Sequence, residues 1–380
     1  MSPMPPPLII FVDGFPFSIL SCVNGWKGFE VQQPLQTGLG YSINIKSEIF
    51  GGHRADDLGF FNEWQLRPHY AVQPPGGTLE RASLLIERIY YLDRIVHRAY
   101  AMLRHQVCNI PFRFVGYFHE AGLSVFSPQF PHPTIMSRYP ALKVFSLATY
   151  AGRVADGLRD RCVYEDAKRA VREGFPVLAA FEEFDGAGHS YGVGTPEYMD
   201  RVHEFVGWVD DLVKTFRSQN GDAGEIFLFS DHGMANVTEE AELDIERTFG
   251  RAAPDRYLYF LDATMARVWL FDPTLRESIA SYLQSRNFGR LVDDETRQRY
   301  GIASRHGGDL LFLLNEGIGL CPTFFGRRTA KALHGYDPTL ANQQGVFLYS
   351  GPRSEAARMV SAISVIHPLL DDALRHGGSQ

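Results

Sequence analysis

Residues 226–234 read Ile-Phe-Leu-Phe-Ser-Asp-His-Gly-Met, in which an apolar run is followed directly by an acid, a histidine and a glycine. A short apolar run without polar alternation is typical of a strand buried on both faces of a parallel sheet. Leu8–Val12 and Val177–Phe181 have the same character, and each is followed within a few residues by an aspartate. Sites in open α/β sheets form at the carboxyl ends of the strands. We therefore expect an α/β fold with a central, mostly parallel sheet whose three aspartates share one edge.

Helices are expected to flank this sheet. Thr195-Pro196-Glu197 has the pattern of a helix start, with a capping threonine, proline at the first helical position and an early acid. Apolar residues then keep helical spacing as far as Asn220-Gly221, which predicts the end of the helix. A second helix is expected to begin at Thr78, after a run of prolines and glycines.

The 380 residues are enough for one large α/β domain with an insert or for two domains, and we expect one core with an insert. Between about residues 65 and 165 the sequence turns aromatic and proline-rich, as in the stretch Phe-Ser-Pro-Gln-Phe-Pro-His-Pro at 126–133. We expect residues 1–65 and 165–380 to form the core, and residues 66–164 to form an inserted helical or irregular cap.

Composition and charge argue against several classes of protein. The chain has 37 Lys and Arg against 44 Asp and Glu, a net charge of -7, which argues against a nucleic-acid polymer as partner but leaves room for a small phosphorylated substrate. Its four cysteines are widely spaced without a CxxC pair, so neither a thiolate zinc site nor a disulfide framework is expected. No apolar run reaches the roughly 18 residues of a membrane span or the length of a signal-peptide core. We expect a cytoplasmic protein, and the sequence leaves its oligomeric state open.

Three carboxylates and three imidazoles near the strand ends form a candidate ligand set for zinc or another borderline divalent ion. In Asp185-Gly-Ala-Gly-His189, the two glycines are expected to let the backbone turn tightly, so that both side chains reach one ion. Taken singly, such residues are more often turn formers, helix caps or hydrogen-bonded core histidines. Their joint occurrence in this order favours a metal site. The set is Asp13, Asp185, His189, Asp231, His232 and His334.

The motifs that carry these residues resemble those of the alkaline phosphatase superfamily, and most of all its type I phosphodiesterase/nucleotide pyrophosphatase branch. They are Asp13-Gly14, Asp185-x-x-x-His189, Ser230-Asp231-His232-Gly233-Met234 and His334-Gly-Tyr-Asp-Pro. The resemblance runs from about residue 8 to residue 338, without much of the expected cap. It implies two divalent metal ions, zinc or alternatively manganese. Asp185, His189 and His334 would hold one ion, and Asp13, Asp231 and His232 the other.

The resemblance also implies a hydroxyl nucleophile soon after the first strand. Ser42 matches that position, because two later glycines fall at the family's offsets from it, whereas Thr37 and Ser47 fit the spacing less well. The alternative is that Ser42 only caps a helix that begins there. Asn62 lies one residue from the position of a phosphate-contacting asparagine in the family, which makes it a candidate substrate-binding residue.

This chain departs from the family in ways that bear on its substrate. Family diesterases usually have threonine where this chain has serine, and residues 51–59 lack the proline and histidine of the usual Thr-Gly-x-x-Pro-x-x-His-Gly stretch. We expect a metal-dependent hydrolase with a seryl-phosphoryl intermediate that acts on a phosphodiester or a nucleotide pyrophosphate. The alternatives are a phosphomonoesterase or phosphomutase of the same superfamily, and an inactive, metal-stabilised binding protein. A sulfatase is excluded by the missing Cys/Ser-x-Pro-x-Arg motif, and a dehydrogenase by the missing GxGxxG.

Overall fold

The computed structural model describes residues 4–23, 26–67, 110–111, 114, 116–120 and 122–377. The chain forms two compact units, one of Met1–Arg54, Leu123–Asn236 and Lys331–Gln380, the other of Ala55–Gly122 and Val237–Ala330. The helix expected from Thr78 lies outside the described residues.

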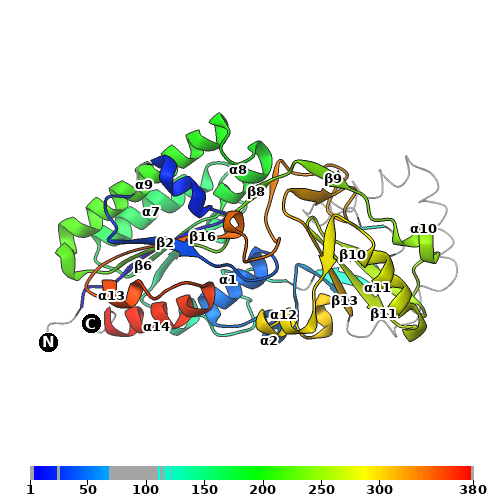
Figure 1. The fold of residues 1–380 in the computed structure, drawn as a ribbon. Coiled ribbons are helices and arrows are strands. Elements are labelled where there is room, and N and C mark those ends of the chain that lie inside the picture. The colour runs from blue at the N-terminus through cyan, green and yellow to red at the C-terminus, as the bar shows by residue number, and fades with distance from the viewer. Residues whose placement is uncertain are drawn as a thin grey trace. The chain divides into compact units, whose positions relative to one another are not determined.

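A six-stranded sheet forms the centre of the first unit (Figure 1). Its strand order is β2-β16-β7-β1-β6-β5, which are Val31–Leu35, Gly345–Ser350, Ile226–Ser230, Leu8–Val12, Val177–Phe181 and Lys143–Phe145. β1 pairs in parallel with β6 and β7, and β5 in parallel with β6, whereas β16 runs antiparallel to β7 and β2. The expected central, mostly parallel sheet is confirmed, and the three apolar runs are its neighbouring strands β7, β1 and β6.

Two layers of helices cover this sheet (Figure 1). Leu8, Ile10 and Val12 of β1 pack in the layer of α7 (Arg159–Arg172) and α9 (Pro196–Asn220). The alternate residues Ile9 and Phe11 pack in the layer of α1 (Ser42–Gly51) and α14 (Ile366–Gly377). Successive side chains of a strand point to opposite faces, so a strand covered on both sides is apolar throughout.

Helix α9 begins and ends where the sequence predicts. Thr195 is its N-cap and accepts a hydrogen bond from the Tyr198 N–H at 3.4 Å, Pro196 is its first residue, and Gly221 follows its end. The smaller elements of this unit are α5 (Ile135–Arg138), α6 (Leu147–Tyr150), α8 (Glu183–Tyr191), α13 (Ser354–Ala357) and the antiparallel pair β8 (Ala235–Asn236) and β15 (Ala332–Leu333).

The second unit is built on an antiparallel sheet. Its order is β10-β11-β13-β12, which are Tyr257–Leu261, Met265–Leu270, Leu310–Leu314 and Gly289–Leu291. Two strand pairs are β9 (Glu239–Ala241) with β14 (Ile318–Leu320) and β3 (Trp64–Leu66) with β4 (Phe118–Glu120). The α-helices among its described residues are α2 (Ala55–Leu58), α10 (Ile245–Phe249), α11 (Arg276–Gln284) and α12 (Asp294–Arg299).

The boundaries of the two units differ from the boundaries expected for the core and the insert. Of the expected insert 66–164, residues 123–164 cluster with the first unit, because β5 extends its sheet beside β6. Residues 237–330, expected in the core, cluster in the second unit, where the antiparallel sheet forms its own apolar centre. The role of residues 66–164 as a cap stays a prediction.

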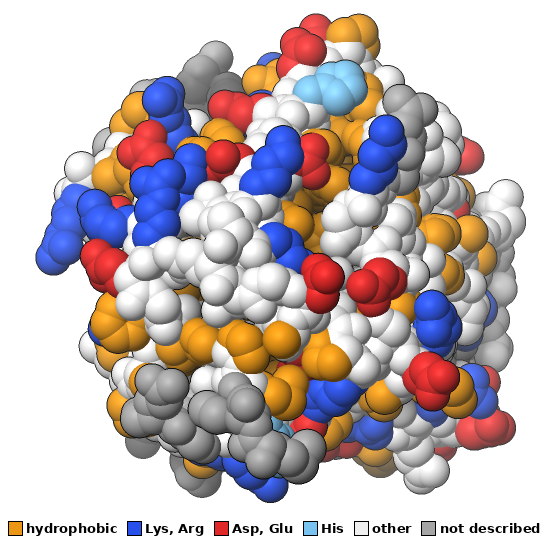
Figure 2. Space-filling model, turned by 90° about the vertical axis from the view of Figure 1, so that its left-hand side faces the viewer, with side chains coloured by type: hydrophobic (Ala, Val, Ile, Leu, Met, Phe, Trp, Pro, Cys, Tyr) orange, Lys and Arg blue, Asp and Glu red, His pale blue; other side chains and the backbone are white. Residues whose placement is uncertain are grey.

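The surface carries charges of both signs. On the face drawn in Figure 2, Lys and Arg side chains lie among Asp and Glu side chains. Helix α7 shows such pairing, with Arg161 3.1 Å from Glu165 and Lys168 2.5 Å from Asp211. An exposed pair such as Arg161 and Glu165 stabilises a fold by about 1 kcal/mol at most. Within the described residues, no helix combines the length and the apolar character of a membrane span.

Candidate active site

Adjacent strand ends bring the predicted acids together. Val12, the last residue of β1, pairs with Phe181 of β6 on one side and with Ser230 of β7 on the other, so the three strands end level. Asp13 and Asp231 come directly after two of these residues, and both are buried. Gly14 has a φ of 70° and donates its N–H to Asp231 Oδ1 at 3.2 Å.

Ser42 lies beside this pair of acids. It is the first residue of α1, whose N-cap is Tyr41, so Ser42 does not itself cap the helix. Its Oγ lies 3.3 Å from Asp13 Oδ1 and 2.8 Å from His232 Nε2. Of the alternative hydroxyls, Ser47 donates to the Ile43 carbonyl oxygen at 2.8 Å, and Thr37 is buried. Ser42 is therefore the hydroxyl that the fold brings to the acid and imidazole cluster, although its role as nucleophile stays a prediction.

Asp185 and His189 lie on a helix, and the expectation of a tight glycine turn between them is wrong. Both belong to α8, where a spacing of four residues places side chains on one face. His189 Nε2 lies 3.2 Å from Asp185 Oδ2, and its Nδ1 bonds the Ala332 carbonyl oxygen at 2.8 Å. The helix, rather than backbone freedom at the glycines, brings the two ligand types together.

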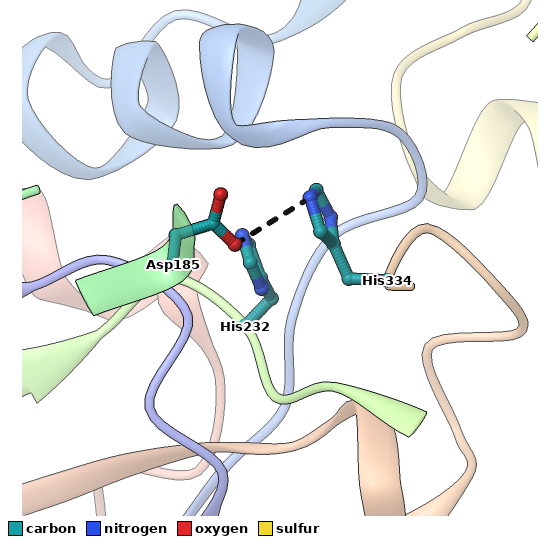
Figure 3. Close-up of side chains that lie close together, drawn as sticks. All are labelled: Asp185, His232 and His334. Atoms are coloured by element: carbon teal, nitrogen blue, oxygen red, sulfur yellow. Dashed lines mark ion pairs between the residues drawn. The ribbon is translucent and has the colours of Figure 1, made fainter. Parts of the chain in front are cut away.

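His334 completes the cluster from the loop after β15. Its Nε2 lies 3.9 Å from Asp185 Oδ1, and its ring stacks on that of His232 with 3.6 Å between ring centroids (Figure 3). His232 in turn holds its own Nδ1 against the Gly233 carbonyl oxygen at 2.8 Å, which leaves Nε2 toward Ser42. All six predicted ligands thus meet in the first unit.

The residues present fit a divalent metal. Two groups have ligand atoms within 4.8 Å of one another: Asp13, Asp231 and His232, and Asp185, His232 and His334. The first is a predicted set; in the second, His232 stands where the sequence predicted His189, so that grouping stays a prediction. Asp231 Oδ2, Asp185 Oδ1 and His334 Nδ1 are buried with no hydrogen-bond partner among the described residues. Each such atom costs about 1–3 kcal/mol, which a cation bound by oxygen and imidazole ligands would offset.

Burial and charge shift the protonation of this cluster. Burial and the charge of Asp13 raise the pKa of Asp231 to about 7. Burial acts to lower the pKa of His232, but the carboxylates of Asp231 and Asp13 raise it to about 9. Burial acts to raise the pKa of Asp13, but Lys46 and His232 hold it well below its usual value. The carboxylates therefore draw cations to this edge of the sheet.

Lys46 and Glu182 join the site, and the sequence analysis missed both. Lys46 Nζ lies 2.5 Å from Asp13 Oδ2 and 2.9 Å from Glu182 Oε1, and all three side chains are largely buried. Glu182 follows β6 directly. The one available signal was the position of Lys46, four residues after Ser42 and thus on the same face of a helix.

Asn62 lies in the second unit. Its Nδ2 donates to Asp262 Oδ1 at 2.6 Å, and its Oδ1 accepts the Glu63 N–H at 2.7 Å. Asp262 also binds the buried Arg267, with 2.8 Å between Arg267 Nε and Asp262 Oδ2. Both polar groups of Asn62 thus have partners within this unit, and its contact with a substrate stays a prediction.

Known folds match almost the whole chain. The murine ectonucleotide pyrophosphatase/phosphodiesterase 5 structure has a TM-score of 0.66 at 13% identity, covering 98% of this chain and 95% of that chain. The human protein gives the same values. Phosphonoacetate hydrolase from Sinorhizobium meliloti 1021, in complex with phosphonoformate, has a TM-score of 0.65 at 13% identity, covering 99% and 96%. No curated protein matches by sequence.

Structural matches at 13% identity show the fold but not the family. A match to a family's sequence model identifies the family. The model described as type I phosphodiesterase/nucleotide pyrophosphatase matches residues 103–307, more than half of the chain. Four of the six predicted ligands, namely Asp185, His189, Asp231 and His232, fall inside the match. The chain belongs to the type I phosphodiesterase/nucleotide pyrophosphatase family of the alkaline phosphatase superfamily, and it is a hydrolase acting on phosphoric ester bonds.

Proposed function

We propose that this hydrolase depends on divalent metal ions and cleaves a phosphodiester or a nucleotide pyrophosphate through a seryl-phosphoryl intermediate on Ser42. The observation that carries the proposal is the position of Ser42 Oγ, 3.3 Å from Asp13 Oδ1 and 2.8 Å from His232 Nε2. The substrate is a small phosphorylated molecule. We propose the cytoplasm as its compartment; Cys22, Cys162 and Cys321 are free thiols, which suits reducing conditions.

We assign the ions to the two predicted groups of residues. Asp13, Asp231 and His232 would hold one ion, and Asp185, His189 and His334 the other, with zinc preferred over manganese because imidazole forms half of the set. When bound, such ions lower the pKa of the serine hydroxyl and of the attacking water, and they neutralise charge on the phosphoryl oxygens.

The protein's own groups position the serine. Asp13 Oδ1 accepts the hydrogen bond of Ser42 and holds the hydroxyl at the start of α1. Ser42 Oγ loses its proton to solvent and attacks phosphorus, the phosphorus–oxygen bond to the leaving group breaks, and the leaving oxygen departs with the bonding electron pair. Water then attacks the phosphorus of the seryl ester and gives up a proton. The bond between phosphorus and Ser42 Oγ breaks with its electron pair going to Oγ, which takes up a proton and is a hydroxyl again.

The murine neighbour supports a hydroxyl nucleophile in this fold. An inactive threonine-to-alanine variant of that protein is known in complex with AMP, at 14% identity to this chain and a TM-score of 0.65. Serine differs from threonine by one methyl group and offers the same hydroxyl. We therefore propose a nucleotide diester in preference to a monoester.

One experiment tests substrate class and intermediate together. The purified enzyme, loaded with zinc or with manganese, is assayed on 4-nitrophenyl phosphate and on the 4-nitrophenyl ester of a nucleoside 5′-monophosphate, which share a leaving group. We expect faster turnover of the diester and, after an acid quench, a nucleotidyl group on the peptide that contains Ser42. Faster turnover of the monoester would instead identify a phosphomonoesterase. A label on a peptide with Thr37 or Ser47 and not Ser42 would reject Ser42.

A further inference from the structure

The two oxygens of the Asp13 carboxylate bind two different side chains of helix α1. The Oδ1 atom of Asp13 accepts from Ser42 Oγ at 3.3 Å, whereas Oδ2 lies 2.5 Å from Lys46 Nζ. Ser42 is the first residue of α1 and Lys46 lies one turn later, so both side chains leave the same face of the helix. Side chains of α1 therefore contact both carboxylate oxygens of Asp13.

Lys46 is held in place by more than Asp13. Its Nζ lies 2.9 Å from Glu182 Oε1, and its ammonium group lies 5.5 Å from the centroid of the Phe11 ring. Glu182 is fixed in turn, because its Oε2 accepts the N–H of Leu147, the first residue of α6, at 3.1 Å. A buried lysine that contacts two carboxylates and an aromatic ring has little freedom to adopt another side-chain conformation.

We infer that Lys46 is a positioning residue of the proposed hydrolase: it holds Asp13 Oδ2, so that this carboxylate presents only Oδ1 to Ser42 and to a bound metal ion. The inference rests on the proposed function, because it concerns the ion that Asp13, Asp231 and His232 would hold. A lysine that only stabilised the fold would not control how many oxygens Asp13 offers.

Two effects of Lys46 can be separated. The positive charge of Lys46 repels a metal ion bound by Asp13. Its removal therefore lowers the dissociation constant of that ion by roughly tenfold to a hundredfold. Its contact with Oδ2 fixes the orientation of Asp13, so its removal frees both oxygens and lowers kcat. Tighter metal binding with slower turnover is a combination that simple loss of folding does not produce.

The variants are Lys46→Met, Lys46→Arg and the double variant Lys46→Met/Glu182→Gln. The double variant removes both charges of the pair, so it keeps the net charge of the wild type while Asp13 Oδ2 has no lysine partner. It also leaves no charged Glu182 without its partner, so we expect it to disturb folding less than the single variant does. The matched control is Lys214→Met, which removes an exposed lysine of α9. Thermal unfolding of each metal-free protein reports folding.

Three readouts are compared: the dissociation constant of Zn²⁺ from competition with a chromophoric chelator, the visible spectrum of the Co²⁺-loaded protein, and kcat. We expect tighter Zn²⁺ binding in Lys46→Met, wild-type affinity in the double variant and Lys46→Arg, and reduced kcat in both proteins that lack a cation at position 46. Co²⁺ absorbs less strongly as its coordination number rises, so a second Asp13 oxygen weakens the bands in the double variant.

The outcomes distinguish this inference from the proposed function. If the double variant keeps the wild-type Co²⁺ spectrum and kcat, Lys46 does not position Asp13, while the proposed function stands. If Lys46→Met binds Zn²⁺ no more tightly than Lys214→Met does, the charge effect is overturned. A wild-type protein that binds no divalent ion overturns the proposed function and this inference with it.

Discussion

Ser42 Oγ and His232 Nε2 lie 2.8 Å apart, although 190 positions separate the two residues in the sequence. Ser42 begins α1, and His232 follows β7 by two residues, so the contact needs the helix to be seated against the sheet. The reactive geometry that we propose is therefore a product of the packed core and not of a local motif.

Replacing Ser42 with alanine tests the nucleophile. We expect Ser42→Ala to lower turnover by several orders of magnitude, because the protein loses the atom that attacks phosphorus, while Ser42→Thr retains part of the activity. Metal content and melting temperature should stay close to the wild type. Ser47→Ala is the matched control, since Ser47 bonds the Ile43 carbonyl oxygen, and its turnover should stay within a few-fold. If Ser42→Ala turns over substrate as fast as Ser47→Ala does, with both near the wild-type rate, Ser42 is not the nucleophile.

Two glycines beside the ligands should respond differently to alanine. A Cβ at Gly233 would lie 2.6 Å from the Gln344 carbonyl oxygen and closer still to that of Asn342, both of them backbone atoms. We expect Gly233→Ala to lower the free energy of unfolding by about 1–3 kcal/mol. At Gly186, inside α8, a Cβ would meet nothing within 4 Å. There alanine should stabilise the fold by up to about 1 kcal/mol. Chemical denaturation measures both, and a neutral Gly233→Ala would contradict the close packing of the loop.

Metal binding should weaken in acid. The pKa of His232 is raised to about 9 and that of Asp231 to about 7, so in the absence of a metal both groups carry protons at neutral pH to a large extent. A metal ion must displace these protons, so its apparent affinity rises with pH through this range, and binding releases protons. Calorimetric titration in buffers of different ionisation enthalpy measures the release. Affinity that is constant from pH 6 to pH 9 would exclude these two residues as ligands.

Asp160 should make the fold less stable as pH rises. Its carboxylate is buried and accepts the N–H groups of Glu182 and Glu183 at 3.0 and 3.1 Å. Burial and the charge of Glu183 nevertheless raise its pKa to about 7. A raised pKa in the folded state means that protonation favours folding. This contribution is complete below about pH 4 and is lost as pH rises through 7, on the order of a few kcal/mol.

Asp160→Asn isolates this contribution. Asparagine stays neutral but can accept only one of the two N–H groups well, so the variant should be about 1 kcal/mol less stable than the wild type at pH 5. At pH 8 the difference should shrink or change sign, because only the wild type has to bury a charge. Denaturant titrations at both pH values measure it, and parallel pH profiles would show that Asp160 does not titrate there.

Local patterns predicted the central strands and α9, because apolar runs and capping residues carry their information within a few positions. They failed for α8, where glycine is a poor helix former but packing of the helix overrides the preference. They also missed Lys46, whose partners Asp13 and Glu182 lie 33 and 136 positions away. The antiparallel sheet of the second unit was not foreseen either, because the pattern of a strand does not say which sheet it joins.

The level ends of β1, β6 and β7 have a consequence for how this chain can change over evolutionary time. Deleting or inserting one residue within β1 would turn its buried side chains to the opposite helical layers and shift Asp13 along the strand by about 3.3 Å. Length changes in the loops that approach these strands from the other edge leave the spacing of the acids intact. Relatives of this chain should therefore keep the lengths of β1, β6 and β7 up to the acids that follow them, and differ in length mainly in the loops.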